Sequence, residues 1–200
     1  MSVNLKTPAE DYPVTLEEAK KQCEINTAVS RHDDYLLGLI RAATDYIERV
    51  TGRDLIERVW YEYFDRFPSG NGDIELKKGP VVSIAGITYT NPDASPQQVT
   101  VATSVYGLDN GITPSIVYLK YNQNWPTVTT MHNGVRIEYT SGYSPAGDDD
   151  PAVNVPEPLK QAIKMIVSDL FEHREHHLEM QTYKNPAVDM LIGEFMVYAL

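Results

Sequence analysis

The 200-residue chain is short of cysteine, of basic residues and of long apolar runs, and each shortage excludes something. A single cysteine, Cys23, excludes an internal disulfide framework, and its apolar surroundings favour a small buried hydrophobe over a reactive thiol. The start, MSVNLKTPAEDYP, lacks the basic residues and apolar core of a signal peptide. No uncharged apolar run approaches the about 18 residues of a membrane helix. We therefore expect a soluble protein of a reducing, cytoplasmic compartment, with no membrane contact.

Basic charge is scarce, because 17 Lys and Arg residues stand against 28 Asp and Glu residues, for a net charge of −11. The basic clusters Lys20-Lys21 and Lys77-Lys78 are short and lie close to acidic residues, which is not the pattern of a nucleic-acid footprint. Such a balance disfavours tight binding to the phosphate backbone of DNA. It also keeps the surface well solvated.

Helical periodicity marks the N-terminal part of the chain. Thr15 and Glu18 have the spacing of a capping box before a short helix that runs to about Ile25. Asp33 and Asp34 then begin a second helix, where their charges favour the positive end of its dipole. Gly52 ends it. The core-facing stripe of this second helix consists of Leu36, Ile40, Ala43, Ile47 and Val50.

From Leu55 to about Ser141 the periodicity changes from helical to alternating, and Gly, Pro and Asn residues interrupt the chain often. This pattern predicts short antiparallel strands, with Asn133-Gly134 as the clearest hairpin turn. The candidate strands are 57–64, 73–76, 81–89, 98–102, 106–108, 115–121 and 135–140.

The helical period returns after an Asp-, Pro- and Gly-rich loop at 145–155. Pro156 and Pro158 suit the entry and first turn of a helix, which should run to about His176 and pack on the helix from Leu36 to Val50. The predicted fold class is α+β: a small helical bundle from both chain ends with an antiparallel β-sheet insertion in the middle. The expected parts are an N-terminal helical part (1–54), a β-rich insertion (55–144) and a C-terminal helical part (145–200) packing on the N-terminal helices.

The end of the chain is more apolar than one exposed terminus should be. We therefore expect it to contact a neighbouring subunit or another protein. The predicted contact residues are Met190, Leu191, Ile192, Phe195, Met196 and Tyr198. The alternative is intramolecular packing beside the helix at 159–170.

No constellation of catalytic residues emerges from the sequence, so we expect no enzyme, no cofactor and no metal site. His173 and His177 have the helical spacing of a zinc pair, but Arg174 stands where a zinc protease needs glutamate, and a third ligand is missing. The run Asp148-Asp149-Asp150 lacks the alternating oxygens, central Gly and closing Glu of a calcium loop. Both stretches are typical of solvated polar segments.

Aromatic residues are abundant in the predicted β region. The chain has 13 tyrosines, and Trp60 and Trp125 also fall in this region. They could form a sugar-stacking or protein-contact face, or they could be ordinary half-buried packing at strand positions.

Several segments, taken in order, carry a family resemblance. In 141–175 a Gly-Tyr strand end is followed by an acidic loop and a helix start of the form Val-Pro-x-x-Leu-x-x-Ala-Ile. The other segments are PVTLEEAKKQCEI, DDYLLGLIRAATDYIERVTGRDL, VWYEYFDRFP, IELKKGPVVSIAGITY, VRIEYTSGY and NPAVDMLIGEF. In order and spacing they resemble the tailed-phage head-tail connector family, also called adaptor or head-completion proteins, over nearly the whole chain.

The resemblance implies a structural virion protein of a tailed bacteriophage or prophage. Such a protein assembles in the host cytoplasm and sits in the neck of the virion as a ring, commonly of twelve copies. The implied partners are other copies of the chain, the portal protein above the ring, and the next connector or tail-completion protein below it. Double-stranded DNA would pass through the channel without specific binding. The β insertion departs from the smallest, helical members of the family.

Two other interpretations stay open at this stage. One is a phage tail or baseplate binding module that uses the aromatic β face. The other is a metal-dependent enzyme that uses His173 and His177.

Overall fold

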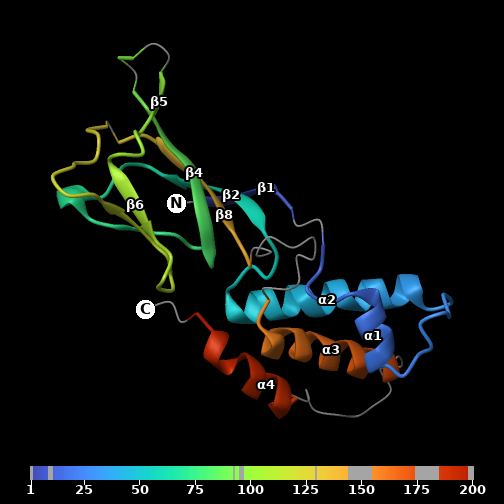
Figure 1. Ribbon diagram of the computed structural model, residues 1–200. Helices are drawn as coiled ribbons and strands as arrows, with labels where there is room; N and C mark the ends of the chain where they lie inside the picture. Colours follow the sequence, from blue (N-terminus) through green and yellow to red (C-terminus); the bar gives the residue numbers. More distant parts are fainter. Residues whose placement is uncertain are drawn as a thin grey trace. The chain divides into compact units, whose positions relative to one another are not determined.

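The computed structural model describes residues 2–8, 11–91, 93–94, 97–128, 130–143, 155–173 and 185–197. It divides into two compact units (Figure 1). The β unit comprises Met1–Ala9 and Glu57–Gly142, and the helical unit comprises Glu10–Ile56 and Tyr143–Leu200. The fold class is α+β, as the sequence predicted. Among the described residues, no helix has both the length and the apolar character needed to cross a bilayer.

The β unit contains two antiparallel sheets. The larger has the strand order β1-β2-β8-β4-β5, and the smaller has the order β3-β7-β6. The strand bounds are β1 Ser2–Thr7, β2 Arg58–Phe64, β3 Ile74–Glu75, β4 Val81–Thr90, β5 Gln98–Thr100, β6 Tyr106–Asp109, β7 Ile116–Leu119 and β8 Val135–Ser141, with a short 3-10 turn η1 at Ser69–Asn71. All seven predicted strands are therefore present.

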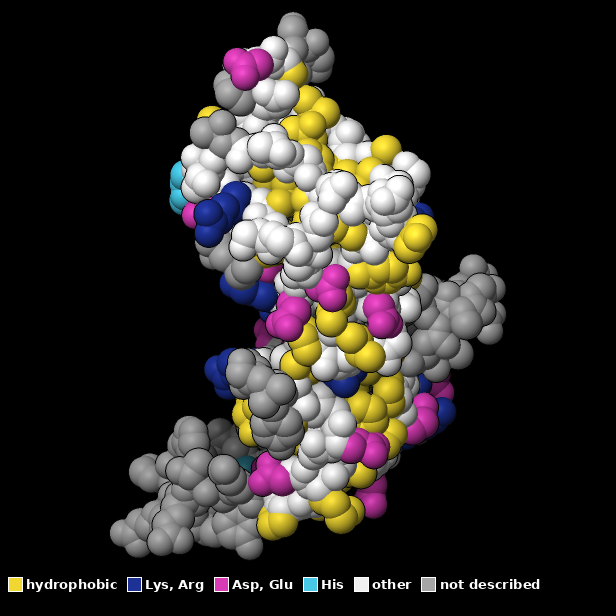
Figure 2. Space-filling view, turned by 90° about the vertical axis from the view of Figure 1, so that its left-hand side faces the viewer, with side chains coloured by type: hydrophobic (Ala, Val, Ile, Leu, Met, Phe, Trp, Pro, Cys, Tyr) yellow, Lys and Arg dark blue, Asp and Glu magenta, His cyan; other side chains and the backbone are white. Residues whose placement is uncertain are grey.

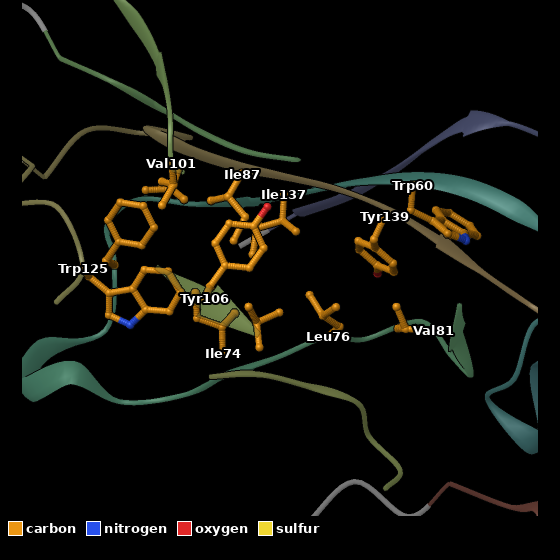
Figure 3. Close-up of a cluster of buried hydrophobic side chains, with 13 residues drawn as sticks. Trp60, Ile74, Leu76, Val81, Ile87, Val101, Tyr106, Trp125, Ile137 and Tyr139 are labelled. Carbon is orange, nitrogen blue, oxygen red and sulfur yellow. The ribbon is translucent and has the colours of Figure 1, made fainter. Parts of the chain in front are cut away.

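The core of the β unit lies between its two sheets, where buried side chains from both sheets point toward one another (Figure 3). Strand alternation explains which residues are inside, because Val135, Ile137 and Tyr139 of β8 are all buried while the residues between them are half-buried. Trp125 closes one end of this core. Its indole stacks on the Phe67 ring at 5.0 Å between ring centres, and its Nε1 donates a hydrogen bond to the Gly72 carbonyl.

Two features of the β unit differ from the sequence prediction. Residues 2–7 form β1 and pair with β2, so they belong to the β unit and not to the predicted N-terminal helical part. Asn133 does lie in a turn, with a φ of 54°, and the Gly134 amide donates to the Met131 carbonyl. It makes no hairpin, however, because β7 pairs with β3 and β6 whereas β8 pairs with β2 and β4. The local sequence thus determines the turn at Asn133, whereas long-range pairing determines which strands lie next to β8.

The helical unit contains four helices: α1 Leu16–Gln22, α2 Asp33–Thr51, α3 Glu157–Glu172 and α4 Pro186–Ile192, followed by the 3-10 turn η2 Gly193–Phe195. The predicted capping box begins α1: the Thr15 amide donates to Glu18, and the Glu18 amide donates to the Thr15 hydroxyl. Gly52 ends α2 in the left-handed conformation, with a φ of 72°. As predicted, α3 packs on α2, and α4 packs on α3 (Figure 1).

Candidate contact surfaces

The C-terminal segment, predicted to make contacts, folds as α4 and η2. Asn185 caps α4 through its side chain, which accepts a hydrogen bond from the Ala187 amide. Val188 and Ile192, one turn apart, are buried within the helical unit, and Met190 between them is 77% exposed. The remaining predicted contact residues Leu191, Phe195 and Met196 are half-buried, and Tyr198 lies outside the described residues. The segment therefore combines a packed inner face with one large apolar side chain in solvent.

The end of the described chain is tied to the C-terminus of α2. Arg53 Nε donates a hydrogen bond of 2.7 Å to the Phe195 carbonyl, and the Val197 amide donates one of 2.9 Å to the Thr51 carbonyl. Nearby, burial raises the pKa of Tyr143, while the adjacent Arg53 acts in the opposite direction. No sequence motif pointed to Arg53, because its role depends on residues 142 positions away.

Charge is distributed very unequally between the two units. The helical unit carries 20 acidic and 10 basic residues, a net charge of −10, whereas the β unit carries 8 acidic and 7 basic residues, a net charge of −1. On the face shown in Figure 2, most acidic side chains lie at or below the middle of the view, and hydrophobic side chains appear in both halves. The acidity noted from composition therefore belongs to the helical unit.

The two tryptophans are core residues. Trp60 and Trp125 are each 8% exposed and belong to the buried cluster of the β unit. A sugar-stacking platform needs an accessible ring face, which neither tryptophan offers. Both tryptophans are therefore packing residues. They are not available to form the exposed aromatic β face that the alternative interpretation requires.

Tyrosine supplies the exposed aromatic surface of the β unit. Tyr121 is 99% exposed in the loop after β7, and Tyr118 on β7 is 40% exposed. The Tyr118 ring lies over Gly107, where an added Cβ would come within 2.5 Å of it. The turn that carries Tyr121 is held on both sides, since the Lys120 amide donates to the Val105 carbonyl and Asn124 accepts from the Asn71 side chain. Tyr121 is thus presented by an anchored loop.

A second tyrosine site lies on the outer face of the larger sheet. The Tyr61 ring has Lys6 Nζ at 5.3 Å and the Arg136 guanidinium at 4.8 Å from its centre. Lys6 also pairs with Glu138. The two cations stack on the Tyr61 ring, and Glu138 neutralises Lys6. The arrangement is that of a polar sheet surface rather than of a catalytic site.

The β unit also buries one carboxyl group, Glu62 on β2, which is fully inaccessible. Its Oε2 accepts hydrogen bonds from the Tyr139 hydroxyl at 3.0 Å and the Lys77 amide at 3.1 Å. Its Oε1 is buried with no hydrogen-bond partner among the described residues. Burial raises the pKa of Glu62 above its usual range, against the lowering effect of these two donors. The sequence did not predict the burial of Glu62, because strand alternation alone does not determine which face of the sheet a glutamate occupies.

The predicted histidine pair is only partly within the described residues. His173 caps the end of α3, where its ring Nδ1 lies 3.0 Å from the Asp169 carbonyl oxygen, and His177 falls outside the described residues. The run 148–150 also falls outside them. In the described ranges, no group of three or more His, Cys, Asp and Glu side chains could hold a metal ion.

The fold of this chain is similar to that of several solved structures. Solved structures similar to this chain include chains from the neck of an empty gene transfer agent particle computed with C6 symmetry (19% identity, TM-score 0.75) and from the virion of a native gene transfer agent particle (20%, 0.73). A third comes from the neck of a native particle computed with C12 symmetry (21%, 0.69). Each alignment covers 100% of this chain and 97% of the other, so the folds agree over their whole lengths.

A search of curated proteins found no match. The family model for the phage gp6-like head-tail connector protein matches residues 13–114, more than half of the chain and a range that crosses from the helical unit into the β unit. The chain therefore belongs to the phage gp6-like head-tail connector family, and it is a structural connector of a phage-like particle.

Proposed function

We propose that the chain forms a closed ring, of twelve copies in the assembled neck, directly below the portal protein, and that this ring extends the DNA channel and receives the next connector or tail-completion protein. The observation that carries this is family membership across residues 13–114. The full-length fold likeness to chains from gene transfer agent necks described with C6 and C12 symmetry supports it. Such a protein resides in the virion neck after assembly in the host cytoplasm.

The charge distribution supports a role for the helical unit at the channel. With a net charge of −10 per copy, a ring of helical units presents a strongly acidic surface. Phosphate groups are repelled by such a surface, so double-stranded DNA would slide past it without sticking. The β unit, with a net charge of −1, contributes little to this repulsion.

Two surfaces are proposed for contacts within the neck. The C-terminal segment, with Met190 outermost, contacts a neighbouring copy or the portal, because an apolar side chain 77% exposed next to a packed helix is typical of a contact residue. On the β unit, the anchored Tyr121 suits docking of a tail component, since rigid exposed tyrosines often dominate interface energy.

The experiment is assembly of the full chain with portal protein, followed by negative-stain imaging and native mass spectrometry. The proposal expects rings that stack on the portal. Monomeric chain that leaves the portal uncovered at all concentrations would overturn it. Deleting residues 186–200 is a poor test of contact, because it also removes the buried Val188 and Ile192. Met190→Lys is better, since it alters the exposed face alone.

A further inference from the structure

Three Asn-Gly pairs occur in the chain, and all of them lie in turns or loops of the β unit: Asn71-Gly72, Asn110-Gly111 and Asn133-Gly134. The side-chain amide of an asparagine can be attacked by the backbone nitrogen of the next residue, which closes a succinimide ring and releases ammonia. Glycine favours this attack, because it has no Cβ to shield its nitrogen and its backbone is permissive. The local structure then determines which pair can react.

The pair Asn133-Gly134 is held in a closed turn. Gly134 is buried, and its amide donates a 2.9 Å hydrogen bond to the Met131 carbonyl. The Asn133 amide donates in turn to Asp65 Oδ1 at 3.0 Å. A carbonyl oxygen is a poor base, so the hydrogen bond to Met131 restrains the Gly134 nitrogen without activating it. Ring closure at Asn133 therefore requires this turn to open first.

The pair Asn71-Gly72 is held by the loop that follows β7. The Asn71 side-chain nitrogen donates a 2.7 Å hydrogen bond to Asn124 Oδ1. The Gly72 carbonyl accepts a 3.0 Å hydrogen bond from Nε1 of the buried Trp125. Both the reacting side chain and the peptide after it are thereby fixed. Ring closure at Asn71 also requires local opening.

The pair Asn110-Gly111 is different, because it is exposed and has a base beside it. Asp109, the last residue of β6, is exposed together with Asn110 and Gly111. The Gly111 amide donates a 3.0 Å hydrogen bond to Asp109 Oδ1. A carboxylate, unlike a carbonyl, can take up the proton of this amide while the nitrogen attacks. The φ of Gly111 is not positive, so its conformation is not one that only glycine adopts.

We propose that Asn110 is a site of selective, spontaneous deamidation, with the Asp109 carboxylate as the base. The Gly111 nitrogen bonds to Asn110 Cγ and passes its proton to Asp109. The Cγ–Nδ2 bond then breaks, and the amide nitrogen leaves as ammonia with that proton. Water opens the succinimide at either carbonyl, which gives aspartate or isoaspartate at position 110. The net change is an amide plus water to a carboxylate plus ammonium, with no oxidant or reductant.

The modification adds charge to the end of the β6–β7 hairpin. Asp109 forms the last pair of this hairpin, with Ile116. A carboxylate at position 110 places two acidic groups next to each other there. The β unit would then carry 9 acidic residues, from 8 plus 1, against 7 basic residues, and its net charge would change from −1 to −2. The surface of this unit therefore changes with the age of the protein.

The test is incubation of the folded full chain in neutral to mildly alkaline buffer, followed by peptide mapping with mass spectrometry and enzymatic methylation of isoaspartate. Asn110 should deamidate at least about tenfold faster than Asn71 and Asn133, because each of these must wait for an opening that is populated one time in ten or less. In urea-unfolded chain the three sites should react at similar rates. Equal rates in the folded chain, or aspartate without isoaspartate at position 110, overturn the proposal.

Asp109→Asn tests the base, because it keeps an oxygen that can accept from the Gly111 amide but cannot take up the proton. We expect the rate at Asn110 to fall by about tenfold, which is less than a base contributes in an enzyme, since water also reaches this loop. The logarithm of the rate should also rise more steeply with pH in Asp109→Asn, where hydroxide has to replace the carboxylate. An unchanged rate with an unchanged pH slope contradicts the role of Asp109.

Discussion

Arg53, just beyond the end of α2, donates a 2.7 Å hydrogen bond from Nε to the carbonyl of Phe195, near the end of the described chain. The Val197 amide adds a second link, to the Thr51 carbonyl. The C-terminal segment is thereby fixed to the end of α2. The position of Met190 consequently depends on packing against α3 and on these two hydrogen bonds.

Arg53→Met should loosen this attachment. The aliphatic part of the side chain is kept and the donor to Phe195 is lost, so we expect the free energy of unfolding to fall by about 1–2 kcal/mol. Hydrogen exchange at the Val197 amide should rise more than exchange in the core of α2. Unaltered exchange at Val197 would show that the Thr51 contact holds the segment alone. Arg31→Met, at an exposed position just before α2, is the matched control.

Local signals in the sequence were sufficient for most elements. The helix ends were predicted correctly because each is set by residues within one helical turn. The structure contains the capping box at Thr15, the left-handed Gly52 and the prolines at 156 and 158 at the start of α3. β1 was missed because six alternating residues gain their stability from pairing with β2, more than fifty residues away. The same long-range pairing overrode the expected hairpin at Asn133-Gly134.

Glu62 should make the stability of the β unit depend on pH. Its pKa is raised by burial, so between the unfolded value of about 4.3 and the folded value the native state holds a proton that the unfolded state has released. Stability from this group is therefore present at low pH and is lost as the pH rises through the folded pKa. Glu62→Gln removes this pH-dependent loss of stability, because glutamine does not titrate.

We expect the free energy of unfolding of Glu62→Gln, relative to the parent, to increase steadily as the pH rises from about 4.3. Urea unfolding across this range measures it. Glu75→Gln, which removes an exposed carboxyl on β3, controls for a general change in charge. A difference between Glu62→Gln and the parent that stays constant with pH would contradict the raised pKa.

The aromatic residues of the β unit should divide sharply into structural and surface types. Trp125→Ala removes a buried ring stacked on Phe67 and should cost about 3–5 kcal/mol of stability. Tyr121→Ala, at a 99% exposed position, should change stability by no more than about 0.5 kcal/mol. Chemical denaturation of the two variants checks both values. A large loss for Tyr121→Ala would assign that ring to the fold rather than to a contact surface.

Gly38→Ala should stabilise the isolated subunit. Alanine fits the helical backbone at this position, and its Cβ meets no neighbour within 4 Å, so a gain of about 0.5–1 kcal/mol is expected. Urea unfolding measures the gain, and Gly52→Ala, at a φ of 72°, should lose stability as the opposing control. A loss at Gly38 would reveal an internal constraint on this glycine.

The contact surfaces were less predictable than the fold. Apolar composition identified the segment from Met190 to Tyr198, but it could not separate the buried Ile192 from the exposed Met190, because that depends on which face of α4 meets α3. The open surroundings of Gly38 could not be predicted from the sequence either, because a glycine within a helical pattern has no single meaning. The two tryptophans likewise required the sheets to be paired before their burial could be known.

The most direct measurement is a cryo-electron microscopy reconstruction of the assembled particle neck. The account predicts a closed ring of this chain between portal and tail, with the acidic residues of the helical unit at the channel wall. A channel lined by basic residues of this chain, or a neck in which the chain forms no ring, would contradict it.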